Sequence, residues 1–156
     1  MSVLEINKID KYEILEEIGC GGMGIVYRAK SNSGEEVAVK VCVTDSVDLV
    51  KRFKREVRAI QKIHHQNVMP ILYANFDSDT PYYVMPLAEK SVFDIIDQLA
   101  NDHKKALSVF LQICYGVQAA HLAGECHRDI KPQNALIMAD GRIVVADFGL
   151  VKFLDR

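Results

Sequence analysis

The chain reads His127-Arg128-Asp129-Ile130-Lys131-Pro132-Gln133-Asn134 and, further along, Asp147-Phe148-Gly149. Asn134 and Asp147 offer the amide and carboxylate oxygens that Mg²⁺ prefers, and Mg²⁺ keeps several of its own waters, so two protein ligands suffice. An eight-residue pattern of this kind rarely arises by chance. The stretch therefore predicts a functional site, and the rest of the sequence can be interpreted around it.

A glycine-rich loop lies near the N-terminus, with the sequence Gly19-Cys20-Gly21-Gly22-Met23-Gly24-Ile25-Val26. Glycine allows a backbone to approach phosphate oxygens closely and to adopt positive φ. On its own, a glycine cluster more often marks only a turn. Here the glycines lie between two predicted strands rather than before a helix, which disfavours a Rossmann dinucleotide site.

Two charged residues come after the glycine loop at informative positions. Lys40 ends the predicted strand Val37-Ala38-Val39-Lys40, and Glu56 lies on the next predicted helix, beside its apolar stripe. A lysine on a strand is usually solvated, and a lone glutamate on a helix usually is too. The order strand, glycine loop, strand and V-A-V-K instead favours a phosphate-contacting lysine, which Glu56 can pair with and orient.

Taken together, these five motifs in this order resemble the protein kinases of the eukaryotic-like superfamily. The segment Asp129-Ile130-Lys131-Pro132-Gln133-Asn134 resembles the serine/threonine class. The segment Gly21-Gly22-Met23-Gly24, followed by Val26-Tyr27, is similar to bacterial serine/threonine kinases. The resemblance covers about Tyr12 to Lys152 and implies ATP and Mg²⁺ as cofactors.

The resemblance implies a role for each charged residue of the motifs. Asp129 accepts or orients the proton of the attacking hydroxyl, and Lys131 steadies the γ-phosphate. Lys40 contacts the α- and β-phosphates and is oriented by Glu56. The implied metal ligands are Asn134 and Asp147, and the implied catalytic residues are Asp129, Lys131, Lys40 and Glu56.

It also implies how the nucleotide is held. The phosphates lie under Gly19, Gly21, Gly22 and Gly24, and the purine is sandwiched by Val26, Ala38 and Leu136. Met85 is the expected gatekeeper. Pro86 supplies only its C=O and Ala88 its N–H, so the missing N–H of proline is compatible with its place. An apolar column linking two lobes is expected from Ile60, Ile71, His127 and Phe148.

The predicted fold is α+β with two lobes that meet near Pro86. Residues 12–85 form the N-lobe, a five-stranded antiparallel sheet with one helix. Its strands are expected at 12–18, 25–29, 36–41, 71–76 and 82–85, and its helix, with Asp45 or Ser46 as N-cap, carries apolar residues from Leu49 to Ile63. Residues 86–156 form a partial, mainly helical C-lobe with the connector, helices at 91–100 and 104–123, the catalytic loop, two short strands and Asp147-Phe148-Gly149.

Composition narrows the classes of partner and compartment. A formal net charge of -2 argues against nucleic-acid binding by bulk charge. No apolar run reaches a membrane span, and the first residues lack the features of a signal peptide. Four cysteines without CxxC spacing indicate reduced thiols and a cytoplasmic protein.

The last expectation concerns the short segment after Asp147. Protein kinases continue into an activation segment and further helices, so we expect this chain to be the N-terminal part of a catalytic domain that phosphorylates protein Ser/Thr hydroxyls, and to be weakly active or inactive by itself. The alternative is a truncated or pseudokinase-like ATP/Mg²⁺-binding interaction module. A small-molecule phosphotransferase is disfavoured by the motifs. The helix at 104–123 is apolar on nearly every face, which predicts a partner or self-association.

Overall fold

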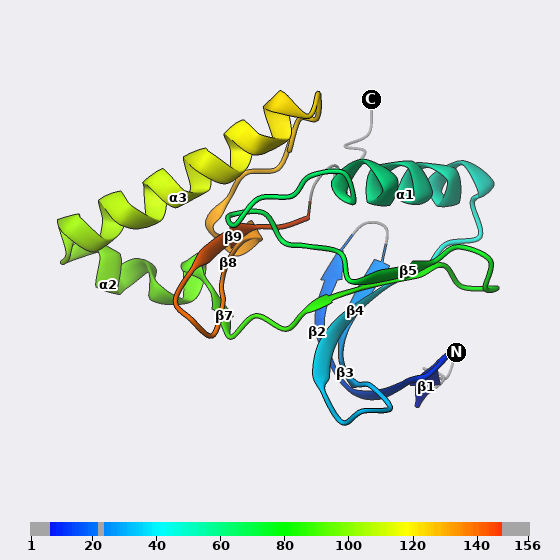
Figure 1. The fold of residues 1–156 in the computed structure, drawn as a ribbon. Coiled ribbons are helices and arrows are strands. Elements are labelled where there is room, and N and C mark those ends of the chain that lie inside the picture. Colours follow the sequence, from blue (N-terminus) through cyan, green and yellow to red (C-terminus); the bar gives the residue numbers. More distant parts are fainter. Residues whose placement is uncertain (1–6, 22–23, 148–156) are drawn as a thin grey trace.

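The computed structural model describes residues 7–21 and 24–147. One part is a curved antiparallel sheet carrying helix α1, and the other is helical with a small sheet (Figure 1). The strand that ends at Pro86 leads from the first part into the second. The two-lobe α+β prediction is confirmed.

The larger sheet has six strands in the order β1-β2-β3-β4-β6-β5. They are β1 (Lys8–Ile9), β2 (Tyr12–Gly21), β3 (Gly24–Lys30), β4 (Glu36–Cys42), β5 (Tyr73–Asn75) and β6 (Tyr82–Pro86). The five predicted strands are present, and β1 is a sixth strand that was not predicted. It pairs with β2 across a turn at Asp10, whose φ is 52°. Two residues are too few to show the alternation by which a strand is recognised in a sequence.

Strand β4 is buried on both faces and separates two apolar clusters. Val37, Val39 and Val41 pack on one side with residues such as Tyr12 and Tyr82. Ala38 and Cys42 face the other side, in the cluster that contains residues of α1. Side chains alternate along a strand, so Lys40 points to the same side as Ala38 and Cys42. The period of the strand thus directs Lys40 into the space between sheet and helix.

Helix α1 spans Val47–Ile60. It begins at Ser46, one of the two predicted N-caps, whose Oγ accepts a hydrogen bond from the Leu49 N–H at 3.4 Å. Such a cap satisfies one of the free N–H groups of the first turn. The helix buries Phe53, Val57 and Ile60. Ile63, predicted to extend the stripe, is buried but lies in the turn after the helix.

The second part contains one long helix and a three-stranded sheet, β7-β8-β9. Its elements are β7 (Lys90–Ser91), the 3₁₀ helix η1 (Val92–Ile95), α2 (Ile96–Ala100), α3 (His103–Leu122), the 3₁₀ helix η2 (Pro132–Asn134), β8 (Ala135–Ile137) and β9 (Ile143–Val145). The helix predicted at 91–100 is divided between η1 and α2. In the described ranges 7–21 and 24–147, no helix is both long and apolar enough to cross a membrane.

The turn at Asn67 joins α1 to β9 and so fixes the approach to Asp147. The Val145 N–H donates to the Asn67 C=O at 2.8 Å, and the Met69 N–H donates to the Val145 C=O at 2.9 Å. The Asn67 side chain donates to the Ile143 C=O at 2.8 Å. Helix α3 packs against this turn at Gly116, where a Cβ atom would lie 2.3 Å from the Asn67 carbonyl oxygen. Only glycine permits that approach.

Gly24 begins β3 where the strand lies directly against β4. A Cβ atom there would lie 2.2 Å from the Val41 carbonyl oxygen, a backbone atom that cannot move aside alone. We expect Gly24→Ala to lower the free energy of unfolding by about 1–3 kcal/mol. The matched control is Gly21→Ala, because a Cβ at Gly21 meets no described atom within 4 Å. Urea denaturation of both variants tests this, and equal losses of stability would contradict it.

Candidate active site

The segment from His127 to Asn134 is anchored by a buried histidine. The Asp129 N–H donates to His127 Nδ1 at 3.1 Å, so the ring proton is assigned to Nε2, which donates to the Ala146 C=O. Burial lowers the pKa of His127, which favours this neutral form. Arg128, between them, has a φ of 68°. The histidine therefore ties Asp129 to the residue just before Asp147.

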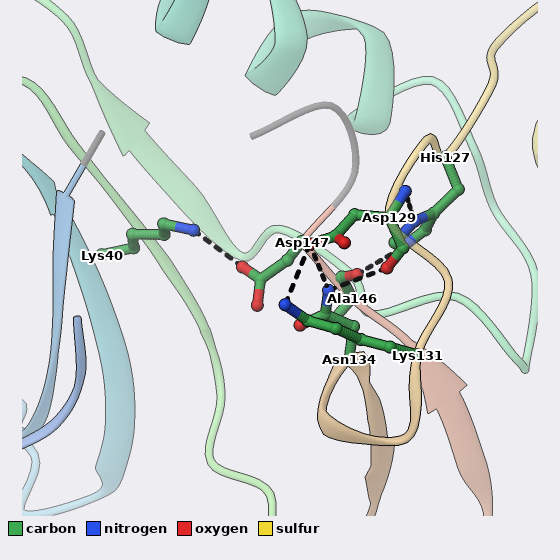
Figure 2. A network of polar contacts seen from close by, with 7 residues as sticks. All are labelled: Lys40, His127, Asp129, Lys131, Asn134, Ala146 and Asp147. Atoms are coloured by element: carbon green, nitrogen blue, oxygen red, sulfur yellow. Dashed lines mark hydrogen bonds and ion pairs between the residues drawn. The ribbon is translucent and has the colours of Figure 1, made fainter. Parts of the chain in front are cut away.

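Asp129 is held by two side chains of its own loop (Figure 2). The Asn134 amide donates to the Asp129 C=O at 2.9 Å and to Asp129 Oδ2 at 3.0 Å. Lys131 Nζ lies 3.4 Å from the same Oδ2. The amide is buried, whereas the carboxylate is 36% exposed. Asp129 is thus oriented by its own loop and remains accessible to a reacting hydroxyl.

Asp147 comes just after β9 and turns its side chain toward the larger sheet. Its φ is 57°, in the left-handed region that is uncommon for non-glycine residues but is adopted by aspartate more often than by most. Lys40 Nζ lies 2.7 Å from Asp147 Oδ1. Figure 2 shows this pair bridging the two parts of the molecule, with the Asp129 group on the far side of Asp147. Lys40 is 6% exposed, so its charge is satisfied inside the protein.

The predicted ion pair between Lys40 and Glu56 is not formed in this structure. Among the described residues, Lys40 pairs with Asp147, and Glu56 Oε2 is buried without a hydrogen-bond partner. Burial raises the pKa of Glu56 to about 7, although Arg55, Arg128 and Lys40 act in the opposite direction. The single ammonium of Lys40 is already engaged by the closer carboxylate. The role of Glu56 therefore stays a prediction.

The raised pKa of Glu56 makes stability depend on pH. The folded-state pKa lies above its ordinary value of 4.5, so the stability of the protonated form is present below pH 4.5 and is lost as pH rises toward 7. We expect Glu56→Gln to raise the free energy of unfolding by about 1 kcal/mol at pH 8, reduced for partial solvent screening, and by much less at pH 5.

Denaturant titrations at the two pH values measure this difference. The exposed Glu13, changed to Gln, is the control and should show no pH-dependent gain. A gain for Glu56→Gln that is equal at both pH values would contradict the assignment.

The residues expected around a purine gather in one apolar cluster that includes side chains from both parts. Ala38 and Met85 are buried in it, and Val26, Ala88 and Leu136 are partly buried against it. Pro86 ends β6 and pairs with Val37. Gly19 pairs with Val26 and Gly21 with Gly24, so these glycines lie at the β2–β3 end of the site. Gly22 lies outside the described residues.

The proposed apolar column is present in part. Ile60 and Ile71 pack in a cluster with Val68 and Val145. His127 is buried and bonded to Ala146, whereas Phe148, like Gly149, lies outside the described residues. Sequence reasoning missed Tyr83, which lines a small pocket together with Asp147. The available signal was its position two residues before Met85, which places both side chains on one face of β6.

The donor set fits a magnesium ion. Asn134 uses its NH₂ group toward Asp129, which leaves the amide oxygen available as a ligand. Asp147 engages Lys40 through one carboxylate oxygen, and the other oxygen can bind a cation. No cluster of three or more His, Cys, Asp or Glu side chains suited to a metal occurs among the described residues, so any ion here would complete its shell with water or phosphate oxygens.

Comparison with known proteins agrees with the resemblance to protein kinases that the sequence motifs indicate. Residues 12–156 match the family model described as protein kinase domain. The chain is 36% identical over 152 residues to a probable serine/threonine-protein kinase of Clostridium perfringens, with 94% of this chain and 22% of that protein covered. It is 33% identical over 165 residues to the serine/threonine-protein kinase PknD of Protochlamydia amoebophila, with 94% and 17% covered. It is 34% identical over 165 residues to the probable serine/threonine-protein kinase PknB of Lactococcus lactis, and this match covers 99% of this chain and 26% of that protein.

The chain spans about a fifth of the length of these relatives. The family model covers nearly all of the chain, including the loop of Asp129 and Asn134 and the strand of Lys40. With this match and the site geometry in agreement, the chain belongs to the protein kinase domain family.

Proposed function

We propose that this chain is part of a serine/threonine protein kinase that transfers the γ-phosphoryl group of ATP to Ser or Thr hydroxyls of proteins. The observation that carries the proposal is the convergence of Lys40, Asp129, Asn134 and Asp147 on one partly buried polar site. Phosphoryl transfer requires little covalent chemistry from the protein. It requires positioned charges and a positioned hydroxyl.

Asp129 is proposed to accept or orient the proton of the attacking hydroxyl. The hydrogen bond from Asn134, 3.0 Å long, fixes the carboxylate, and its partial exposure leaves room for the substrate. Lys131, 3.4 Å from Asp129, is suited to steady the transferred phosphate. Both lie on a loop that the buried His127 anchors, which supports their use as a preorganised pair.

ATP and Mg²⁺ are the proposed cofactors. Asn134 and Asp147 would hold the ion, which when bound neutralises charge on the phosphates. Lys40 would contact the α- and β-phosphates, and the cluster of Val26, Ala38 and Leu136 offers an apolar surface to the purine. The glycines at the β2–β3 end would lie over the phosphates.

We also propose a cytoplasmic location and a protein partner. All four cysteines are free thiols, as in reducing compartments. Helix α3 exposes Leu107, Phe110, Leu111 and Tyr115, an apolar surface suited to contact with further protein, including a second copy. The second candidate function is an interaction module, which would bind Mg-ATP and a partner through this surface without transferring phosphate.

A transfer assay separates the two candidates. The protein is incubated with Mg²⁺, γ-labelled ATP and a generic protein acceptor, and the labelled residue type is identified after hydrolysis. Label on Ser or Thr supports the kinase. Bound Mg-ATP without any transfer, in the full-length protein, supports the interaction module. Label on Tyr alone would contradict the serine/threonine assignment.

A further inference from the structure

A small pocket lies beside Asp147, between β6 of the larger sheet and Ile60 at the end of α1. It is lined by apolar side chains, by Ala146 and by two polar residues, Tyr83 and Asp147. It has room for about one water molecule, and a buried water is stable when it has two or more polar partners. Two of its lining residues, Met85 and Asp147, have predicted roles at the site, whereas Tyr83 has none.

Tyr83 lies on β6, directly across from Lys40, the lysine proposed to contact phosphate. It is the cross-strand partner of Lys40, so the two side chains leave the same face of the sheet. Its ring packs against Phe53 of α1, with the centroids 5.7 Å apart. The residue is 3% exposed. The phenol is therefore fixed in place, with its hydroxyl close to the site.

The Tyr83 hydroxyl makes no hydrogen bond within the described part of the chain. Buried tyrosines usually find a hydrogen-bond partner, and an ordered water can serve as one. Burial raises the pKa of Tyr83 well above its ordinary value, and the nearby carboxylates of Asp147 and Glu56 raise it further. The phenol therefore stays neutral, and its O–H can donate a hydrogen bond into the pocket that Asp147 also lines.

Asp147 offers an acceptor to the same pocket. Its Oδ1 is engaged by Lys40 at 2.7 Å, while its second oxygen can still accept hydrogen bonds. A donor and an acceptor thus line the same pocket, which has room for about one water between them.

We propose that Tyr83 is a positioning residue whose hydroxyl, through one ordered water, holds Asp147 in the orientation that pairs with Lys40. The consequence rests on the proposed function, in which Asp147 binds Mg²⁺ and Lys40 binds phosphate. The ion pair between Lys40 and Asp147 must break before Asp147 can bind Mg²⁺ and Lys40 can bind phosphate. The water-mediated hydrogen bond that stabilises this pair therefore opposes nucleotide binding. Tyr83 then sets how much of the free protein is ready to bind Mg-ATP.

The test removes only the hydroxyl, with Tyr83→Phe in the full chain. Calorimetric titration should show Mg-ATP binding about 2- to 10-fold more tightly than in the wild type, the value of one hydrogen bond. A purely structural role would weaken binding instead. Unchanged or weaker affinity would overturn the proposal.

Tyr82→Phe is the matched control, because Tyr82 is the adjacent buried tyrosine and its hydroxyl donates to Asp10 at 2.6 Å, away from the site. It should lower thermal stability and leave the Mg-ATP affinity unchanged. A gain in affinity equal to that of Tyr83→Phe would assign the effect to loosened packing and overturn the proposal.

A second readout does not depend on nucleotide. A crystal structure of the nucleotide-free wild type, at a resolution that shows waters, should place one water between Tyr83 Oη and the Asp147 carboxylate. A dry contact there would overturn the proposal even if Tyr83→Phe failed to fold. If the wild type showed the water but bound no Mg-ATP, the proposed function would fail while the positioning of Asp147 stood.

Discussion

Asp129→Asn is expected to lower the rate of phosphoryl transfer by about 10²- to 10⁴-fold in the full-length protein, the range for removal of a general acid–base group. The substitution keeps the shape of the side chain and an oxygen that can accept from Asn134, whose amide now bonds Asp129 at 3.0 Å. The loop should therefore stay folded. The loss is the charge that attracts the proton of the attacking hydroxyl. Mg-ATP affinity should change by less than about threefold.

Steady-state transfer assays and calorimetry measure the two quantities separately. Asp140→Asn is the matched control, since Asp140 is an exposed carboxylate in the β8–β9 turn, 3.8 Å from Arg142. It should retain normal transfer. An Asp129→Asn protein that keeps more than about a tenth of the wild-type rate would contradict the role given to Asp129.

The sequence predicted the site best where chemistry depends on neighbours in the chain. Asp129, Lys131 and Asn134 lie within one short loop, so their mutual contacts arise once the loop forms. The strand that carries Lys40 was likewise predicted, and the alternation along β4 accounts for the face on which Lys40 lies. These features need only local geometry and a period of two.

The partner of Lys40 could not be predicted in the same way. Lys40 can reach a carboxylate on α1 or one after β9, and motif order is the same in either arrangement. The choice depends on how the helix and the β9 segment are placed relative to the sheet, which is a tertiary property. The structure pairs Lys40 with Asp147, and Glu56 Oε2 is buried without a hydrogen-bond partner among the described residues. Tyr83 escaped notice because its importance comes from a pocket formed by residues from four different segments.

Short elements were the other limit. Strand β1 has two residues, and the segment at 91–100 is divided between a 3₁₀ turn and a five-residue helix. Neither is long enough to establish a hydrophobic period. In both cases tertiary contacts decide the local structure. Tyr82, for example, donates to Asp10 at the turn that holds β1 against β2.

Lys40→Met is expected to lower phosphoryl transfer by about 10²- to 10³-fold, as for the loss of one electrostatic stabilising group. It should also weaken Mg-ATP binding, because the phosphates lose their buried cation. Methionine fills the space of the lysine stem in the cluster around Ala38 without burying a charge. Lys30→Met, at an exposed position at the end of β3, is the control and should leave both quantities unchanged.

Stability gives the sharper argument, because removing one member of a buried ion pair often costs about 3–5 kcal/mol. Here the cost should be nearer 1 kcal/mol, since the Asp147 side chain is 34% exposed and can be hydrated when Lys40 is removed. A double-mutant cycle with Asp147→Asn isolates the pair, and urea denaturation should give a coupling energy of about 1 kcal/mol. A coupling energy near zero would mean that Lys40 and Asp147 are not paired in the nucleotide-free protein. In that case Asp147 would already be available to a metal ion. The hydrogen bond proposed from Tyr83 would then stabilise no ion pair and would not reduce Mg-ATP affinity.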